Sequence, residues 1–383
     1  MAKALGSLAL MRAAAKTAEI TAAGDRAAPL AESVDSDHHE SRRVRRDAPV
    51  ERDAGATDPA PDGTITAFLD RHFLHYNAGT ARAAAEAWKQ HVDDGGAVVL
   101  TLAGAMSTAQ LGRSIAPMIR AGKIHAISTT GANLEEDVMN LIGRTRYEEL
   151  PDYSQFSPED DEAIYDAGKN RVTDTAIPDA VMVPLANAML KEWRRADKAG
   201  ERYFPHEVLY KILRRETLAS QYVVDPDESW LIAAMEANLP IVVPGWEDST
   251  LGNSYCAALL KGQIENAATV RSGMEYMADL AAWYARTAEQ RAIGCFQIGG
   301  GIAGDFWICV IPMLHEELKR DDLRKLSFFA QVTDAHVSYG GYSGAAPAEK
   351  ITWGKIDSET ETFDIHSDAT IVFPLVAAIV MGW

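Results

Sequence analysis

The sequence has few cysteines, no membrane-length apolar run and no basic stripe. Its three cysteines, Cys256, Cys295 and Cys309, form no CxxC pair and have no zinc-binding spacing, so we expect buried thiols and no metal site. No apolar stretch reaches the roughly 20 residues of a membrane span, and the first twenty residues lack a signal-peptide core. We therefore predict a cytoplasmic protein in a reducing compartment, without a membrane partner.

Positive charge is also scarce in this chain. The 383 residues include 37 Lys and Arg against 55 Asp and Glu, which gives a formal net charge of −18 and a pI near 5.0. No run of Lys and Arg interleaves with aromatic residues, so nucleic acid is not an expected partner. A cationic small molecule suits this charge balance better.

The chain has two parts of different amino-acid composition. Residues 1–62 are rich in Ala, Asp, Glu and Arg and contain no Phe, Trp or Tyr. Such a segment buries too little apolar surface to offset the entropy of ordering, so we predict a disordered or weakly ordered extension, with a docking arm as the alternative. Residues 63–383 are predicted to form one folded domain, because apolar runs recur throughout them.

From Thr64 onward, apolar runs of about six residues alternate with glycine-containing turns and segments of helical periodicity. This alternation is typical of βα units, and strands so uniformly apolar favour a parallel sheet covered on both faces. We predict an α/β fold with a Rossmann-like, doubly wound parallel sheet. A helical insertion is expected at about 144–229, where Ser157 caps a helix in SPEDDE. The expected strands are 97–103, 125–130, 240–244, 293–298 and 328–333, followed by an apolar closing segment at 370–378.

Glycines cluster where several predicted strands end, at Gly104, Gly131, Gly252 and the run 299–301. At the carboxyl edge of a parallel sheet, glycines let backbone amides approach a pyrophosphate, and the helix that follows adds partial positive charge. None of these turns has the full GxGxxG pattern, so their recurrence at equivalent strand ends is what favours a nucleotide site. Acidic residues placed to accept ribose hydroxyls are Glu135, Glu136, Asp248 and Asp368.

The segment SGAAPAEKITWGKID brings Glu349, Trp353 and Lys355 within seven residues. An indole face and a carboxylate both attract an ammonium group, and a desolvated lysine can lose its proton and attack a carbon. The spacing alone is also compatible with a surface turn that carries a solvated lysine.

Taken together, STTGANLEED, DSTLG, the GGG turn, SGAAPAE with KITWGK, and SDATIVFPL resemble the deoxyhypusine synthase family in order and spacing over about residues 64–383. The resemblance implies an NAD-binding catalytic domain and a homotetramer with active sites at subunit interfaces. It also implies transfer of an aminobutyl group from the polyamine spermidine, through an imine on Lys355, to an acceptor amine. NAD takes and returns a hydride in this chemistry, so there is no net redox change.

The resemblance also implies roles for individual residues. Lys355 is the imine lysine, and Trp353 and Glu349 line the polyamine tunnel. The residues that match NAD contacts are Thr108, Thr130, Gly131, Ala132, Glu135, Glu136, Asp248, Gly299, Gly300, Gly301, Asp368 and Ala369.

Three positions depart from the family pattern. Asp305 stands where the family has a histidine credited with moving a proton, and an ordinary carboxylate is a poor base at neutral pH. We therefore consider Asp305 and His336 as candidate proton carriers. Asn253 and Tyr342 stand where the family has acidic residues that hold substrate amines, so both are candidate substrate contacts.

These departures leave the acceptor open. A small diamine such as putrescine, giving homospermidine, is one hypothesis, and a protein lysine, as in deoxyhypusine synthase itself, is the other. A net oxidoreductase, or an NAD- or polyamine-binding protein that has lost catalysis, are the alternatives to a transferase.

Overall fold

The computed structural model describes residues 63–337 and 340–383, so the predicted extension at 1–62 lies outside the described residues. Six parallel strands follow the order β6-β2-β1-β7-β8-β9. In chain order these are the third, second, first, fourth, fifth and sixth strands, which is the doubly wound topology of dinucleotide-binding sheets. The predicted fold class is thereby confirmed. The strands are β1 (Ala97–Leu102), β2 (Ala126–Thr129), β6 (Ile241–Val242), β7 (Ile293–Ile298), β8 (Phe328–Thr333) and β9 (Glu361–His366).

Every residue of β1, β7 and β8 is buried. Leu100 pairs with Ile127 of β2 and with Phe296 of β7, so apolar side chains continue from strand to strand across the sheet. Burial on both faces explains why the residues that point to either face of these strands are mostly apolar. The five predicted strands are confirmed, with each end placed within two residues.

The apolar pattern does not predict β9, whose sequence is ETFDIH. This strand forms the edge of the sheet beside β8, so only Phe363 and Ile365 are buried and the other four side chains are polar. The apolar closing segment belongs to a helix, α14, which begins directly after the edge strand. Its N-cap residue, Asp368, accepts a hydrogen bond from the amide of Thr370 at 2.7 Å.

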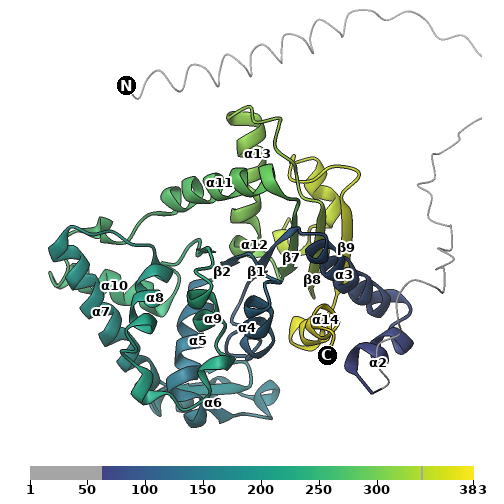
Figure 1. Cartoon of the computed structure of the whole chain (residues 1–383). Helices are drawn as coiled ribbons and strands as arrows, with labels where there is room; N and C mark the ends of the chain where they lie inside the picture. Colours follow the sequence, from purple (N-terminus) through teal and green to yellow (C-terminus); the bar gives the residue numbers. More distant parts are fainter. Residues whose placement is uncertain (1–62, 338–339) are drawn as a thin grey trace, which may run out of the picture. The chain divides into compact units, whose positions relative to one another are not determined.

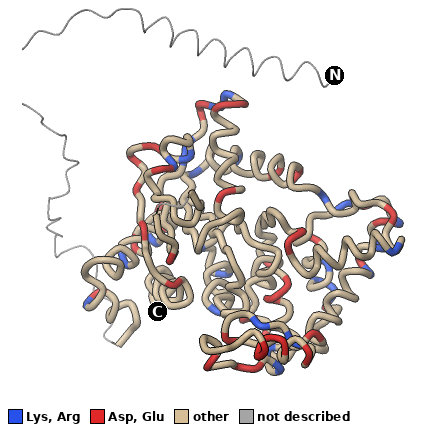
Figure 2. Tube along the Cα trace, turned by 180° about the vertical axis from the view of Figure 1, so that it is seen from behind, with Lys and Arg blue, Asp and Glu red and all other residues tan. Residues whose placement is uncertain are grey.

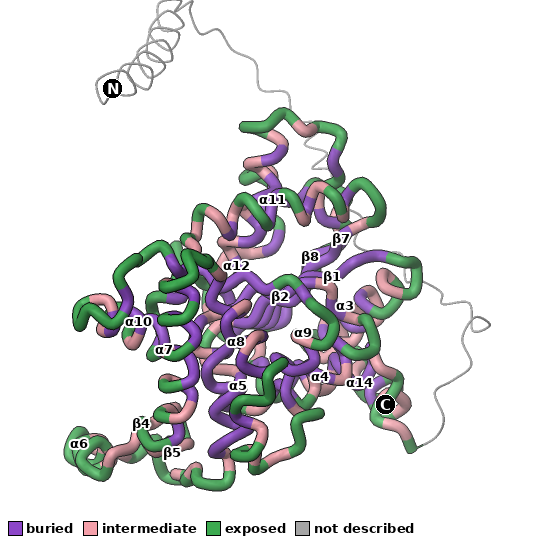
Figure 3. The backbone as a smooth tube through the Cα atoms, turned by 60° about the vertical axis from the view of Figure 1, so that its left-hand side comes forward, coloured by how far each residue is buried: buried purple, intermediate pink, exposed green. Residues whose placement is uncertain are grey.

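Two helical layers enclose the sheet, one with α3, α4 and α14 and the other with α11, α12 and α13 (Figure 1). α5 is buried along almost its whole length, although it carries three consecutive acidic residues (Figure 3). The helices are α2 (Ile65–His72), α3 (Tyr76–Asp93), α4 (Gly112–Arg120), α5 (Gly131–Gly143), α6 (Pro158–Asp166), α7 (Met182–Ala199), α8 (Pro205–Arg214), α9 (Trp230–Glu236), α10 (Thr250–Leu260), α11 (Gly273–Gln290), α12 (Gly301–Ile308), α13 (Val310–Pro312) and α14 (Ala369–Met381).

The insertion at 144–229 contains a small antiparallel sheet in addition to its helices. Its strands are β3 (Glu148–Glu149), β5 (Thr175–Pro178) and β4 (Lys169–Val172), and with two to four residues each they are too short to give a periodic signal. Ser157 caps α6, and Asp160 completes the capping box, which confirms the predicted helix start. Asp and Glu positions gather in the part of the fold around α6 (Figure 2).

Within residues 63–337 and 340–383, no helix is long and apolar enough to cross a bilayer. Cys295 is buried in β7, but Cys256 is exposed on α10, so the prediction of three buried thiols is wrong for Cys256. The helical period explains the difference, because Tyr255 and Ala258 on the same helix occupy its buried face.

Candidate active site

A cavity of about 870 Å³ opens at the carboxyl edge of the central sheet. Its lining comes from residues that follow successive strands, and the insertion adds Tyr153 and residues 172–175. β1 and β7 are neighbours at the point where the strand order reverses, which is where open α/β sheets bind ligands. The segments after the strands are 103–106 after β1, 130 after β2, 299–303 after β7, 333–334 after β8 and 367–370 after β9.

The glycine turn after β7 brings the backbone close to this cavity. Gly299 and Gly301 have φ angles of 70° and 56°, in the left-handed region that favours glycine. A Cβ at Gly300 would lie 2.5 Å from the Oγ of Ser343, and the Gly301 amide donates a hydrogen bond to that Oγ at 3.2 Å. α12 begins at Gly301 and α14 at Ala369, so two helix N-termini with partial positive charge meet at the cavity.

The chemistry of the cavity lining fits NAD. Hydroxyl groups and helix N-termini would bind the pyrophosphate, while three carboxylates, those of Asp174, Asp334 and Asp368, could accept ribose hydroxyls. Among the residues that line the cavity, none is Lys or Arg. A 2′-phosphate in the same place would therefore meet carboxylates without a balancing cation.

We expect the cavity to bind NAD about 100-fold more tightly than NADP, since like charges brought together cost several kcal/mol. Isothermal titration with the two dinucleotides at equal ionic strength measures the difference. The gap should narrow at high salt, where charge repulsion is screened. Equal affinities at low salt would contradict the assignment of the carboxylates to the ribose.

The acidic residues of α5 that were predicted as cofactor contacts bind the protein's own backbone. Glu135 accepts from the amides of Thr250 and Leu251 at 3.1 and 2.9 Å, which holds the start of α10. Glu136 accepts from the amide of Thr108 at 3.1 Å, and burial raises the pKa of Glu136 to about 7. Of the predicted cofactor residues, the cavity is lined by Thr108, Thr130, Gly299, Gly300, Gly301, Asp368 and Ala369, and its lining does not include Gly131, Ala132, Glu135, Glu136 or Asp248.

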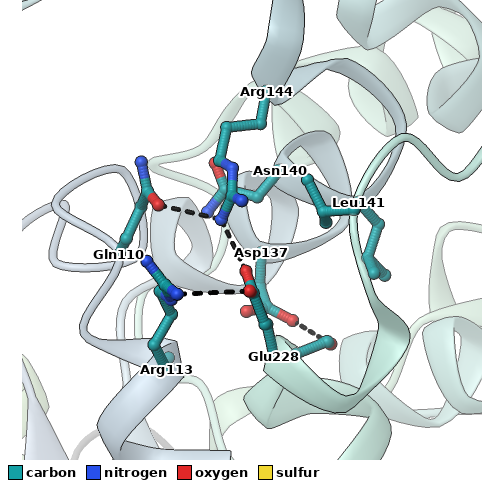
Figure 4. A pocket seen from close by; sticks show the side chains of 10 residues that line it. Gln110, Arg113, Asp137, Asn140, Leu141, Arg144 and Glu228 are labelled. Carbon is teal, nitrogen blue, oxygen red and sulfur yellow. Dashed lines mark hydrogen bonds and ion pairs between the residues drawn. The ribbon is translucent and has the colours of Figure 1, made fainter.

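The third acid of α5, Asp137, lies beside a small pocket (Figure 4). Its carboxylate accepts hydrogen bonds from the hydroxyl of Ser229 and from a backbone amide of α9 at 3.2 Å. Nearby, Glu228 forms an ion pair with Arg144 at 2.6 Å (Figure 4). Burial raises the pKa of Asp137 to about 7. Of these three acids, Glu136 holds a residue that lines the large cavity, Thr108, whereas Glu135 and Asp137 hold the starts of α10 and α9.

From the raised pKa of Asp137 we predict that the free energy of unfolding falls as pH rises. An aspartic acid titrates near 4 in an unfolded chain, whereas the folded protein keeps Asp137 protonated up to about pH 7. Because the folded state binds the proton more tightly, the free energy of unfolding should decrease between about pH 4 and pH 7. Asp137→Asn should reduce this slope, leaving the part that Glu136 contributes through its own raised pKa, and be the more stable protein at pH 8, by roughly 1–3 kcal/mol.

Urea unfolding at pH 5 and pH 8 measures this effect. Asp166→Asn, at an exposed position near the end of α6, is the matched control and should keep the wild-type slope. An Asp137→Asn protein with the wild-type slope would show that Asp137 is ionised in the folded state.

Lys355 follows the turn at Gly354, whose φ angle is 68°. The lysine is 7% exposed, and its ammonium group forms an ion pair with Asp305 of α12. The same ammonium lies 5.4 Å from the ring centre of Tyr342, where an aromatic face attracts a cation. Lys355 is therefore buried against the helix that begins at the glycine turn, and the alternative of a solvated surface lysine is wrong.

The other predicted substrate and proton-transfer residues lie nearer to solvent. Trp353 is 64% exposed, and Glu349 is exposed on the same segment. Asn253 is exposed on α10, where its amide donates to the carbonyl of Ser249 at 2.8 Å. His336 is exposed in the loop after β8. Of the two candidate proton carriers, the structure therefore brings Asp305, and not His336, into contact with Lys355.

Two buried glutamines form a polar layer within the apolar strands. Gln297 of β7 and Gln331 of β8 are register partners. Gln297 accepts from the hydroxyl of Tyr342 at 3.1 Å and donates to the carbonyl of Gly299 at 2.9 Å, while Gln331 donates to Asp364 of β9 at 2.9 Å. The layer links the glycine turn to Tyr342. This layer was not predicted, although a glutamine in each of two apolar runs is a visible signal of it.

The chain is an α/β protein with a doubly wound sheet, a cavity at its strand ends and a buried lysine paired with α12, the helix that begins at the glycine turn. The family model described as "Deoxyhypusine synthase" matches residues 71–380. The chain belongs to the deoxyhypusine synthase family, a family of transferases, and the predicted family is confirmed.

Individual relatives agree with this assignment. The chain is 30% identical over 340 residues to a "Deoxyhypusine synthase-like protein" of Cyanothece sp., which covers 85% of this chain and 82% of the relative. It is 26% identical over 317 residues to a "Probable deoxyhypusine synthase" of Aeropyrum pernix, over 82% of this chain and 93% of the relative. Its fold is similar to that of a "putative deoxyhypusine synthase" from Entamoeba histolytica, with a TM-score of 0.51 at 12% identity over 84% of this chain and 95% of that chain.

Proposed function

We propose that this member of the family transfers an aminobutyl group from spermidine, or a related polyamine, through an imine on Lys355 to an acceptor amine. The observation that carries the proposal is the burial of the Lys355 amine against α12, the helix that begins at the glycine turn of the cavity. NAD held in this cavity would supply a hydride acceptor that later returns the hydride, so the overall reaction is an alkyl transfer.

The bonds and electrons of this reaction balance. In the donor, the bond between the aminobutyl carbon and the secondary nitrogen breaks, and 1,3-diaminopropane leaves. A bond from that carbon to the Lys355 nitrogen replaces it, and a bond to the acceptor nitrogen later replaces the bond to Lys355. The two electrons that leave the carbon as hydride return to it at the end.

Asp305 is the group in place to move protons at Lys355. Its carboxylate contacts the Lys355 ammonium, and 42% of the Asp305 side chain is exposed, so it can exchange protons with solvent. Lys355 must lose a proton before it attacks a carbon, and an entering substrate ammonium can replace it beside Asp305. The ring of Tyr342 offers that ammonium an aromatic face.

We propose a small diamine such as putrescine as the acceptor, with homospermidine as the product. The motivation is the set of departures from the family pattern, because Asn253 and Tyr342 stand where acidic residues would hold substrate amines. A lysine of a protein acceptor is the second candidate. Both acceptors present a primary amine, so the chemistry at Lys355 is the same for either.

We also propose that the chain works in the cytoplasm as a homotetramer in which a neighbouring subunit completes each site. Three large apolar side chains are exposed around the site: Trp353, Ile351 and Ile302. Exposed apolar groups next to a site are typical of a surface that another protein covers. Light scattering coupled to size-exclusion chromatography should give the mass of four chains, and a monomer would contradict this assembly.

The test of function incubates the protein with NAD, labelled spermidine and either putrescine or a hypusine-type translation factor. Mass spectrometry identifies which acceptor gains the aminobutyl group. Borohydride added during turnover should fix an aminobutyl group on Lys355 only when NAD and spermidine are both present. Accumulation of NADH without transfer would indicate a net oxidoreductase, and no added mass on Lys355 would indicate a binding protein. Either result overturns the proposal.

A further inference from the structure

A second lysine, Lys350, is buried beneath the site and has no role in the chemistry proposed above. It is 2% exposed, and among the described residues its Nζ has no hydrogen-bond partner. This Nζ lies 4.5 Å from the ring centre of Phe329 and 4.9 Å from that of Tyr342. A buried ammonium without a hydrogen bond is destabilising, so its presence here calls for a functional reason.

Tyr342 is the neighbour that Lys350 shares with Lys355. The Tyr342 ring centre lies 4.9 Å from the Nζ of Lys350 and 5.4 Å from the Nζ of Lys355, so the two nitrogens are at most about 10 Å apart. Two positive charges at this distance, with little water near Lys350, repel each other. The repulsion between two such amines changes the pH at which one of them loses its proton by an amount on the order of one unit.

Charges from several elements act on the two amines. Burial lowers the pKa of Lys350 to about 8, so this lysine still carries its charge in most molecules at neutral pH. The Asp305 carboxylate forms an ion pair with the Lys355 ammonium. The other titratable groups packed around the two lysines are Cys295 of β7, Cys309 after α12, Tyr342, Asp364 of β9, and Glu316 next to Gly354.

We infer that Lys350 is a positioning residue whose charge, acting across the ring of Tyr342, favours the neutral and reactive form of the Lys355 amine. The inference rests on the proposed function, since an imine-forming lysine needs a neutral amine. When a substrate ammonium takes the place of Lys355 at Asp305, the repulsion from Lys350 is no longer offset. The proton then leaves Lys355 at the moment when the donor is present.

Lys350→Met tests this inference, because it removes the charge and keeps a side chain of similar length. The variant should fold and melt at a higher temperature than wild type, since an apolar chain replaces a buried ammonium. Cyanate carbamoylates neutral amines, and peptide mass spectrometry reads its rate at Lys355 across pH without NAD or substrate. We call the carbamoylation rate of Lys355 as a function of pH the Lys355 profile. In Lys350→Met we expect this profile to shift to higher pH by about one unit, so that the carbamoylation rate of Lys355 at pH 7 falls by up to about tenfold. Exposed Lys261 is the internal reference.

Two further variants separate charge from structure. Lys350→Arg retains the positive charge and should keep the wild-type profile at Lys355. Lys211→Met removes an ammonium that lies 3.4 Å from the ring centre of Tyr203, away from the site, and should also leave the profile unchanged. An unshifted profile in folded Lys350→Met overturns the inference, as does an equal shift in Lys350→Arg. Failure of the wild-type protein to transfer an aminobutyl group would refute the proposed function instead, because the cyanate profile needs no substrate.

Discussion

Lys355→Met should lower aminobutyl transfer by more than about 1,000-fold, because it removes the nucleophile that would carry the group covalently. Methionine is close to lysine in length and suits a position that is 7% exposed, so the fold should persist. Product formation from labelled spermidine, followed by mass spectrometry, measures the loss. NAD affinity should stay within about threefold of wild type, because Lys355 is not part of the cavity lining.

Lys261→Met provides the control for this prediction. Lys261 is exposed at the end of α10, so its loss should leave transfer unchanged. A Lys355→Met protein that retains more than a tenth of the wild-type rate would show that the group never passes through a covalent bond to this lysine.

Gly300→Ala should weaken NAD binding by roughly 5- to 150-fold. A Cβ at Gly300 would lie 2.5 Å from the Oγ and 2.6 Å from the Cα of Ser343, so either the glycine turn or the segment that carries Ser343 must move. Overpacking of this kind costs about 1–3 kcal/mol. Isothermal titration with NAD measures the loss, and borohydride fixation at Lys355 should fall with it.

Gly341→Ala is the matched control for the glycine turn. Gly341 has a φ of −77°, and a Cβ there would meet no heavy atom within 4 Å among the described residues other than its chain neighbours, so NAD should bind as it does to wild type. Equal NAD affinity in the Gly300→Ala and Gly341→Ala proteins would mean that the turn after β7 does not approach the dinucleotide.

The interior of the sheet could be predicted from the sequence because burial on both faces forces an apolar side chain at nearly every position. β7 and β8 therefore have the predicted bounds. The same logic fails at the edge strand β9, where only Phe363 and Ile365 are buried and no apolar run exists. The short strands of the insertion fail for another reason, since two to four residues are fewer than the pattern needs.

Motifs in the sequence point to the residues of the candidate site, but the contacts of their side chains could not be predicted from it. The WGK segment identifies Lys355, yet its partner Asp305 is 50 residues away and becomes a neighbour only when α12 packs against that segment. Glu135 and Glu136 follow a strand end, as ribose-binding acids do, but α5 directs them to backbone amides. Lys350 was not singled out from the sequence, and it is 2% exposed in the fold.

The hydrogen bond between the Gly301 amide and the hydroxyl of Ser343 joins the glycine turn after β7 to the segment that carries Ser343. Both segments border the cavity, and the segment that carries Ser343 continues through Tyr342 toward Lys355. We therefore expect a dinucleotide that binds at the glycine turn to shift the position of the segment that carries Ser343 as well. Thermodynamic reciprocity then requires the polyamine to change the affinity for the dinucleotide by the same factor. We therefore expect the affinity for the amine to differ between the protein with bound NAD and the protein without it.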